Sequence, residues 1–513
     1  MLLKTLKPKA HGNDKTVMTT KLIITAFLRS IFSNSIVQAM MFSKTAITVD
    51  KEANDINKKK SEPQILPPVI ETKTLGNEMN NNSVNDMTVG SPLRAITSFA
   101  IPLIMGYILQ QMYLIIDAAI VGRWIGVEAL AAVGASSSIM FLIMGFCNGS
   151  CAGFAIPVAQ AFGAKDYAKM RAYVSNSIRI AIVLAVVITF LSCIFCGKIL
   201  HLVNTPADVF DDAYTFLILQ FAAIPFTIAY NLLSGQIRAL GNSKQPFYFL
   251  IAASLVNILL DIVLILIMGL GVEGAGIATW LSQGFSVALC VWYIKKHMQI
   301  LIPQGNEREY DNKKVSILLN NGVPMGLQFS ITGIGIVMLQ SANNALGTMY
   351  VAAFTASMRI KYLFTCVFEN IGVAMATYCG QNLGAGKLDR VGQGVKAAIK
   401  VMVVYFVFTF VVIYPFANYM MMLFVDSGEA EVVNLAAQFM RIANYFYPCL
   451  GLLTILRYSI QGLGYSNFSM LSGVMEMISV IGLPMVFMEP FVFVQPSSCG
   501  NLCRRPRERV WRI

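Results

Sequence analysis

The stretch FYFLIAASLVNILLDIVLILIMGLG, at residues 247–271, decides the class of fold. A helix needs about 20 apolar residues to cross the hydrocarbon core of a bilayer, and this run is long enough. Two polar side chains, Asn257 and Asp261, nevertheless lie well inside it. Because a charged side chain at the bilayer centre costs about 2.5–3.5 kcal/mol on insertion scales, we expect this pair to face a cavity or a partner.

Similar apolar runs recur from about residue 96 onward, which excludes one large soluble core. Hydrophobic residues make up 56% of the chain and charged ones only 13%, against about 25% charged in soluble domains. Only helices or closed barrels can span lipid, and these runs are too long for barrel strands. The sequence therefore predicts an all-α polytopic membrane protein, with helices at 93–121, 128–159, 174–198, 213–236, 247–270, 274–296, 318–345, 350–380, 394–418, 432–459 and 466–488.

Composition divides the chain into five expected segments. They are a disordered or extraneous leader at 1–90, a first lobe with helices 1–6 at 91–296, a cytoplasmic connector at 297–315, a second lobe with helices 7–11 at 316–488 and an aberrant basic tail at 489–513. The leader is rich in polar residues and proline, which do not build a core. The tail is too polar to span a bilayer, so we expect the second lobe to lack its last helix through a frameshift or truncation.

The charges of the loops predict the orientation of the chain. Lys and Arg concentrate in the loops after helices 2, 4, 6 and 8, whereas the alternate loops carry mainly acids such as Asp211 and Glu429. By the positive-inside rule, the basic loops and the start of helix 1 face the cytoplasm. We therefore expect a multi-pass protein of the plasma (inner) membrane with a cytoplasmic N-terminus. The net charge of +12 lies in loops and at the ends, so the expected partner is the lipid bilayer and not nucleic acid.

The two halves of the chain repeat one another. The equivalent pairs are QAFGAKD at 160–166 with QNLGAGK at 381–387, ALGNS at 239–243 with GLGYS at 462–466, and Pro102 with Pro324. An even number of helices in each repeat relates the halves by an axis along the membrane normal. We predict two pseudo-symmetric six-helix lobes around a central cleft, because transporters build their sites between such repeats.

These motifs resemble the multidrug and toxic compound extrusion family of secondary transporters. The match runs from about Asn85 to about Ser479 and is carried by AIPLIMGYILQQMYLIIDAAIVGRWIGVEALAAVGA at 100–135, QAFGAKD, GQIRALGNSKQPF at 235–247 and GQNLGAGK at 380–387. The resemblance implies twelve helices in two lobes, and export of small organic, often cationic compounds in exchange for protons or sodium ions. It implies no cofactor beyond the H+ or Na+ coupling ion, and we expect a monomer.

Polar residues of the first lobe are the candidates for ion coupling. Asn257 and Asp261 are four residues apart, so they share one face of a helix. Asp117 on helix 1 is a second acid, and Thr279 on helix 6 adds a hydroxyl. Two carboxylates in one lobe favour retention of a proton by one of them, and the same oxygens also suit sodium. The resemblance implies the same set, Asp117, Asn257, Asp261 and Thr279.

Each acid also has a purely structural interpretation. The carboxyl group of Asp261 would then only pin helices together by hydrogen bonds. The carboxyl group of Asp117 would reach the outer interface beside Arg123.

Four residues are candidates for contact with substrate: Gln110, Tyr113, Asn231 and Glu369. Tyr113 lies one turn before Asp117 on the same helical face. Glu369 would meet a cationic substrate, or else form a structural ion pair with Arg359 or Lys361 on its own helix. Gln110 and Asn231 would otherwise make ordinary hydrogen bonds between helices.

The sequence argues against two other classes of protein. An enzyme is not expected, because His11, His201 and His297 fall in the leader or loops and no nucleophile–base pair stands out. The spacing of Cys193 and Cys196 resembles a metal motif but lacks a second pair, so packing explains both cysteines. The alternative function is a lipid-linked oligosaccharide flippase of the same broader architecture. A flippase would favour an arginine-lined cleft, whereas acids dominate the first lobe.

Overall fold

The computed structural model describes residues 85–202, 205, 210–344, 348–425 and 429–478. The expected leader up to residue 84, the expected tail and the last part of predicted helix 11 lie outside these residues. Every regular element in the described part is helical, and no strand occurs there. Seven of the described helices are long and apolar enough to cross a membrane, and nine are if each of two bent pairs counts as one span. The prediction of an all-α polytopic membrane protein is confirmed.

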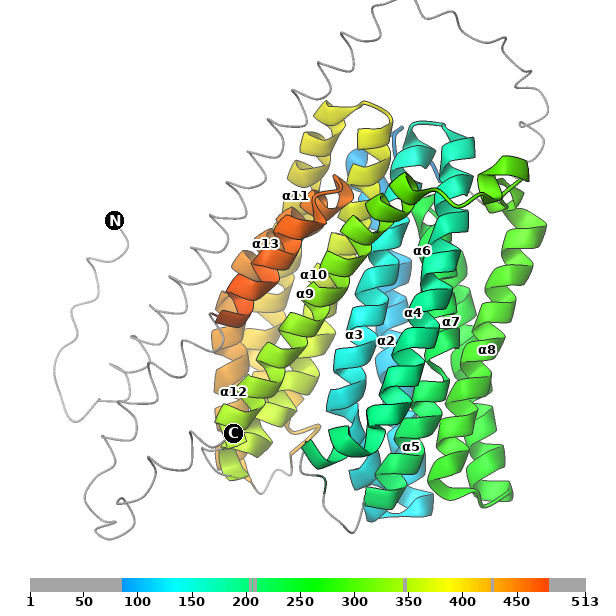
Figure 1. Ribbon diagram of the computed structural model, residues 1–513. Helices are drawn as coiled ribbons and strands as arrows, with labels where there is room; N and C mark the ends of the chain where they lie inside the picture. Colours follow the sequence, from blue (N-terminus) through cyan, green and yellow to red (C-terminus); the bar gives the residue numbers. More distant parts are fainter. Residues whose placement is uncertain (1–84, 203–204, 206–209, 345–347, 426–428, 479–513) are drawn as a thin grey trace, which may run out of the picture.

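The helices fall into two lobes joined by a connector (Figure 1). The first lobe contains α2 (Pro92–Ile120), η1 (Val121–Ile125), α3 (Val127–Gly163), α4 (Tyr167–Leu202), α5 (Phe210–Ala222), α6 (Ile224–Ala239), α7 (Lys244–Asp261), η3 (Ile262–Ile267) and α8 (Gly271–His297). The connector contains η4 (Gln299–Leu301) and η5 (Gly305–Arg308). The second lobe contains α9 (Asn312–Asn344), α10 (Thr348–Gly384), α11 (Leu388–Met421), α12 (Ala430–Tyr445), α13 (Tyr447–Gly462) and a helix over 466–478.

Two of the predicted helices are in fact bent pairs. The helix expected at 213–236 breaks between α5 and α6 with a bend of 41°, and the one expected at 432–459 breaks between α12 and α13 with a bend of 51°. Pro225 and Pro448 stand in the first turn of α6 and α13. Because proline lacks the backbone N–H and its ring clashes with the preceding turn, it starts a helix well but interrupts a continuous one.

Helix α2 belongs to both lobes. Its first turns pack into the core of the second lobe, where Ile96, Phe99 and Ala100 are buried beside residues of α10 and α11. Its later part packs against α7 of the first lobe. The helix predicted to open the first lobe therefore crosses from one lobe to the other.

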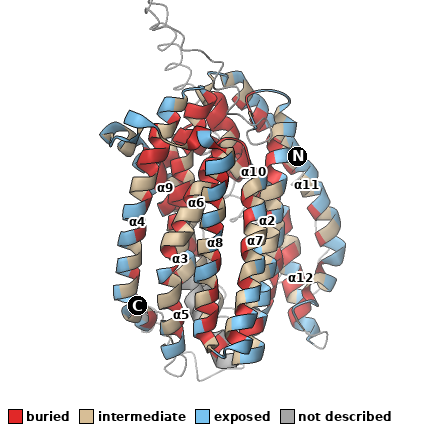
Figure 2. Ribbon diagram, turned by 90° about the vertical axis from the view of Figure 1, so that its right-hand side faces the viewer, coloured by how far each residue is buried: buried red, intermediate tan, exposed pale blue. Residues whose placement is uncertain are grey.

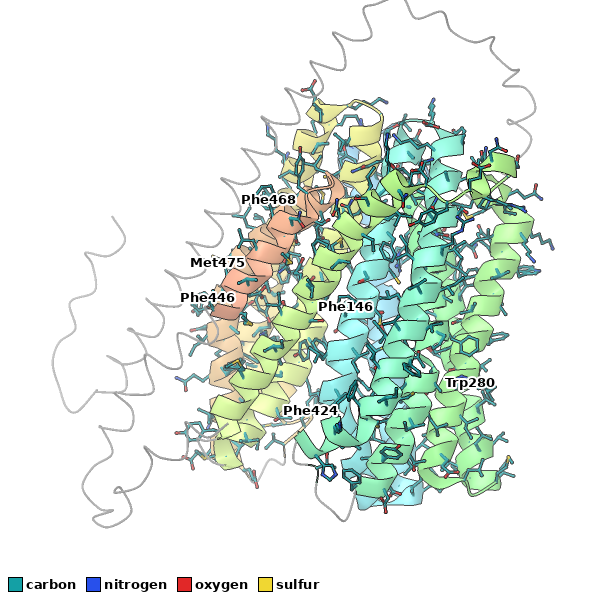
Figure 3. The ribbon with its side chains drawn as sticks, in the orientation of Figure 1. Phe146, Trp280, Phe424, Phe446, Phe468 and Met475 are labelled. Atoms are coloured by element: carbon teal, nitrogen blue, oxygen red, sulfur yellow. The ribbon has the colours of Figure 1, made fainter. Side chains whose placement is uncertain are left out.

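Glycines form the main seam between the lobes, where α3 packs along α9. Gly149 and Gly153 on α3 meet Gly322 and Gly326 on α9, and a β-carbon at any of them would collide with the facing helix. Phe146 lies at the same contact (Figure 3). Each pair has the four-residue spacing of small residues that lets two helix backbones approach closely in a membrane.

Burial is uneven along the length of the helices. We call the end that carries the connector and the loops after α3, α6 and α10 the connector end; it is uppermost in Figure 1. The lobes converge there and diverge toward the opposite end. Figure 2 shows buried residues gathered toward the connector end, while the outer faces of α4 and α11 are exposed. Exposed Val183, Phe190 and Val404 on these faces are what a lipid-facing surface requires.

Candidate functional site

The two acids predicted in the first lobe meet. Asp117 lies near the end of α2, and Asp261 is the last residue of α7, which packs against α2. Their carboxyl groups are neighbours that interact directly. Two ionised carboxylates repel one another and can only accept hydrogen bonds, so a bond between them would form only if one carried a proton. Arg123 does not neutralise Asp117 but lies over the ring of Trp124, with 5.6 Å between guanidinium carbon and ring centroid.

Each acid stands just before a short π-helix. η1 begins four residues after Asp117, and η3 begins directly after Asp261. The two π-helices pack against one another, and each is followed by glycines with positive φ: Gly126, Gly269 and Gly271. Such π-helical turns are rare and occur frequently at functional sites. Sequence reasoning missed them, although the glycines after both segments are the available signal.

The acid pair lacks hydrogen-bond donors. Four oxygens are buried without a partner among the described residues: Asp117 Oδ1, Asn257 Oδ1, Asp261 Oδ1 and Asp261 Oδ2. Asp261 is 0% exposed and Asn257 4%. Buried polar atoms are nearly always satisfied, so four unsatisfied acceptors on adjoining helices need an explanation. Protons or a cation with oxygen ligands would satisfy them, and no protein group here does.

The other two first-lobe candidates near the acids differ in position. Tyr113 lies within electrostatic range of both Asp117 and Asp261. Thr279 is on α8, which packs against α7, but its hydroxyl donates to the carbonyl of Ala275 at 3.0 Å. Within the described part of the chain, no hydrogen bond joins Thr279 to either acid. The structure thus groups Tyr113 and Asn257 with the acid pair and leaves Thr279 one helix away.

Gln110 and Asn231 are not part of this group. Gln110 is exposed on α2. The amide of Asn231 donates to Asn148 Oδ1 at 2.7 Å and to the carbonyl of Thr227 at 2.9 Å. Asn231 therefore makes a hydrogen bond between α6 and α3.

The acid of the second lobe has a base as its partner. Arg457 on α13 lies 3.6 Å from Glu369 and 3.0 Å from Glu476, and the Tyr458 hydroxyl donates to Glu369 at 2.9 Å. We call these four residues the second-lobe charge cluster. The prediction that Glu369 pairs with Arg359 or Lys361 on its own helix is wrong. Its partner is Arg457, which α13 supplies from far along the chain. The arginine side chain is only 6% exposed, whereas Glu369 is 44% and Glu476 30% exposed.

The repeated motifs meet at the connector end. The Gln160 side chain donates to the carbonyl of Gly462 at 3.0 Å, and the Gln381 side chain donates to the carbonyl of Ala239 at 2.8 Å. A β-carbon on Gly163 would overlap the Gln381 carbonyl, and one on Gly384 would overlap that of Gln160. We call Gln160, Gly163, Gln381 and Gly384 the latch. Each glutamine of one repeat thus bonds to the start of the other lobe's second repeated motif.

Residues 85–90, predicted from sequence to be part of the leader, cover this latch. The backbone N–H of Asn85 donates to Leu240 of the first lobe at 3.1 Å. The N–H of Met87 donates to Gln381 Oε1 of the second lobe at 2.9 Å, and the Met87 side chain is 0% exposed. This short segment therefore ties both lobes together.

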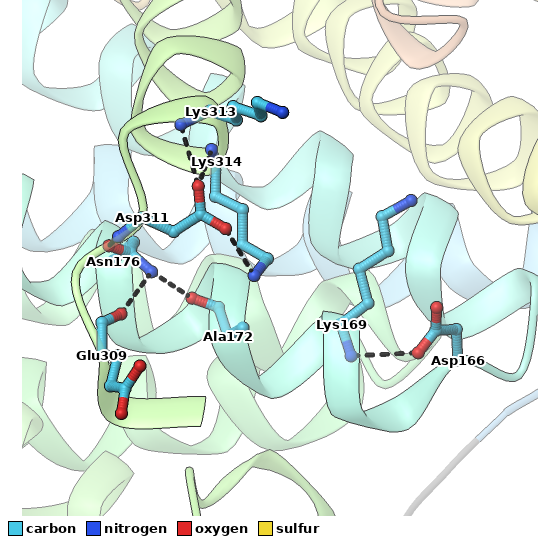
Figure 4. Close-up of polar contacts among 8 residues, drawn as sticks. All are labelled: Asp166, Lys169, Ala172, Asn176, Glu309, Asp311, Lys313 and Lys314. Atoms are coloured by element: carbon cyan, nitrogen blue, oxygen red, sulfur yellow. Dashed lines mark hydrogen bonds and ion pairs between the residues drawn. The ribbon is translucent and has the colours of Figure 1, made fainter. Parts of the chain in front are cut away.

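The connector is docked on the first lobe. The Asn176 amide on α4 donates to the carbonyls of Ala172 and Glu309, and Asp311 accepts from Lys314 at 2.8 Å (Figure 4). Arg171 forms two hydrogen bonds of 2.6 Å to Glu307. These bonds hold the pKa of the Glu307 carboxyl below its ordinary value of 4.5. Among all the described residues, no group of three His, Cys, Asp or Glu side chains is placed so that it could hold a metal ion.

Comparison with known proteins gives the family of the chain. The MatE family model matches residues 102–263 and 324–488, one match in each half. The "Probable multidrug resistance protein YpnP" of Bacillus subtilis (strain 168) is 28% identical over 379 residues, which cover 74% of this chain and 84% of the relative. The "Multidrug export protein MepA" of Staphylococcus aureus (strain MSSA476) is 20% identical over 400 residues, which cover 78% and 88%.

Solved structures show the same fold. One, described as "Outward-facing conformation of a multidrug resistance MATE family transporter of the MOP superfamily", aligns with a TM-score of 0.71 at 21% identity, covering 79% of this chain and 97% of the other. A MOP superfamily transporter from Pyrococcus furiosus aligns with a TM-score of 0.70 at 21% identity, covering 79% and 96%. The family consists of transporters, which confirms the prediction that the protein is not an enzyme. With both halves matched by its model, this chain belongs to the MatE family, the multidrug and toxic compound extrusion transporters that its motifs resemble.

Proposed function

We propose that this protein is a cation-coupled antiporter that exports organic, often cationic compounds across the plasma membrane. One observation carries the proposal: Asp117 and Asp261 adjoin in the first lobe with four donorless oxygens around them. Two acids buried together favour the binding of a proton or another cation. The names of the relatives, a multidrug resistance protein and a multidrug export protein, support organic compounds as substrate.

The coupling ion is H+ or Na+, and the site is compatible with both. A proton would be held between the two carboxyl groups. Sodium would take carboxylate oxygens from Asp117 and Asp261 and the amide oxygen of Asn257. Thr279 would join this shell only after its hydroxyl leaves Ala275. Either ion neutralises the same charges, so binding of the ion and binding of a cationic substrate can exclude one another.

The latch supports alternating access as the transport mechanism. It closes the connector end, which by the positive-inside rule is the cytoplasmic face. The described state is then closed to the cytoplasm, and its lobes diverge toward the outside (Figure 1). Opening to the cytoplasm requires the two glutamine hydrogen bonds to break, while the glycine seam of α3 and α9 stays packed.

Substrate contacts are proposed at Tyr113 and Glu369, with Gln110 and Asn231 as weaker contributors. Glu369 keeps nearly half of its side chain exposed although Arg457 is beside it, so a cation can still approach it. Aromatic faces such as that of Tyr113 attract organic cations.

The deciding experiment uses the full chain in proteoliposomes with an organic cation as cargo. A pH gradient and a sodium gradient are imposed separately, each with the other clamped. Efflux driven by one gradient and abolished by Asp261→Asn is the expected result. An efflux rate that is the same with and without either gradient would overturn the coupling proposal. Translocation of a lipid-linked oligosaccharide in place of the cation would favour the flippase instead.

A further inference from the structure

Arg238 occupies an unusual place between the lobes. It is the second-last residue of α6 and lines a cavity of about 60 Å³ bounded by α3, α6, α9, α10 and α13. The cavity lies directly against the latch, since Ala159 and Ala239 also line it. Its volume is about twice the 30 Å³ that a water molecule occupies in the liquid, so it has room for one small polar group.

Nothing in the described part of the chain pairs with this arginine. No hydrogen bond or ion pair reaches its guanidinium there, and the groups that act on it electrostatically are Tyr230, Cys290 and Cys151. The hydroxyl of Tyr230 already donates to the carbonyl of Pro246. A guanidinium held in a membrane protein without a counter-charge is costly, so such groups normally pair or face a ligand.

On the second-lobe side of the cavity, a lining residue contacts a partly exposed glutamate. Tyr458 is that residue, and its hydroxyl donates to Glu369. In the second-lobe charge cluster the arginine is buried, whereas the two glutamates are partly open. An unpaired cation therefore stands on the first lobe, and accessible carboxylates stand beyond Tyr458 on the second.

We propose that this cavity is an acid subsite, in which Arg238 binds the carboxylate of an amphoteric substrate whose cationic end lies toward Glu369. The inference rests on the proposed export function and narrows its substrate class to molecules that carry both charges. A bidentate pair between arginine and carboxylate is strong and directional. A carboxylate bound there would contact both lobes beside the latch. Its binding would therefore affect the contact that has to break when the lobes separate.

Two dyes that differ only at the carboxyl group test this subsite. Rhodamine 110 carries a free carboxyl group beside its cationic ring system, and rhodamine 123 is its methyl ester. In proteoliposomes of the full chain, Arg238→Gln should raise the KM for rhodamine 110 by about tenfold or more, as expected for loss of a charge-assisted hydrogen bond. The KM for rhodamine 123 should change less than about twofold. Glu369→Gln should weaken transport of both dyes, because both carry the cation.

Arg94→Gln is the matched control, since Arg94 is exposed and lies outside the proposed site. Arg238→Lys keeps a cation in the cavity and should retain much of the transport of rhodamine 110, which guards against a folding defect. Equal losses for both dyes in both Arg238 variants would show a structural role and overturn the subsite. Unchanged kinetics for rhodamine 110 in Arg238→Gln would overturn it too. Transport of the ester alone by the wild type would reject the subsite but keep the export function, whereas transport of neither dye would reject both.

Discussion

The two lobes treat the carboxylates within their helices in opposite ways. In the first lobe, Asp117 and Asp261 have only each other, and their oxygens lack donors. In the second lobe, Arg457 lies between Glu369 and Glu476, and Tyr458 donates to one of them. An acid that the protein itself neutralises is fixed in charge, whereas an acid pair without a base needs a cation from outside. The comparison supports our proposal that ion coupling belongs to the first lobe, with a constant charge in the second.

The largest effect is expected at the acid pair where we propose that the coupling ion binds. Asp117→Asn or Asp261→Asn should reduce gradient-driven efflux by at least about 100-fold, because an amide cannot exchange a proton or supply a carboxylate ligand. Membrane insertion should be unchanged. Efflux rates in proteoliposomes measure the effect, with Asp212→Asn, an exposed acid of α5, as control. Wild-type efflux rates in both variants would contradict the assignment of ion coupling to this acid pair.

The second lobe should respond in stability and not only in transport. Arg457→Gln leaves two carboxylates beside one another without their base. Breaking a fully buried pair costs about 3–5 kcal/mol, and the cost here is smaller because Glu369 and Glu476 are 44% and 30% exposed and solvent screens them. We expect thermal unfolding of the purified protein in detergent to shift downward. Adding Glu476→Gln to Arg457→Gln should recover part of the loss, because it removes one of the stranded charges. If the Arg457 variant is as stable as the wild type, the cluster is not structural.

The latch links the two lobes, and opening it should shift their spacing. In Gly163→Ala the new β-carbon would overlap the Gln381 carbonyl, which should disfavour the closed connector end by about 1–3 kcal/mol. Spin labels at Lys165→Cys and Lys387→Cys should report a longer distance between the connector-end loops. Gly392→Ala is the control, because a β-carbon there meets nothing within 4 Å. An unchanged distance distribution in Gly163→Ala would mean that the contact does not hold the lobes together.

The smallest effect is expected at the connector. Arg171 depresses the pKa of Glu307, so its stabilising contribution is present above pH 4.5 and lost as pH falls through the lowered pKa. Glu307→Gln should cost about 1–2 kcal/mol at neutral pH, given a bidentate and largely buried pair, and should flatten the acid side of the stability profile. Thermal unfolding is measured from about pH 3 to about pH 7, a range that extends on both sides of the ordinary pKa of 4.5. The same acid-side slope in the variant and in Glu309→Gln, whose side chain is exposed, would contradict the assignment.

Much of the acid pair was predictable because the signal is local. A carboxylate inside an apolar run is visible without any structure, and Asn257 lies four residues before Asp261 by helix geometry alone. That the pair includes Asp117 follows once α2 and α7 pack together, which the family resemblance implied.

The partners of Glu369 were not predictable from the sequence near it. Arg359 and Lys361 are close in the chain, but Arg457 comes from α13, and only helix packing brings it to α10. Pro225, Pro448 and the glycine spacing of α3 and α9 are present in the sequence, but the helices at 213–236 and 432–459 were predicted to be continuous. Their meaning depended on which helices face one another, and hydropathy does not specify that in a bilayer where all helices are apolar.

The glycine seam also bears on how the protein is made. Gly149 and Gly153 emerge from the ribosome long before Gly322 and Gly326, and α4 to α8 are synthesised between them. Contacts between segments so distant in the chain form slowly, because the intervening polypeptide must first be ordered. We therefore expect the glycine face of α3 to stay without its α9 contacts until α9 has been synthesised. We expect pairing of the two lobes to be a late step of assembly, so that a substitution in this seam lowers the yield of paired lobes while each lobe still inserts.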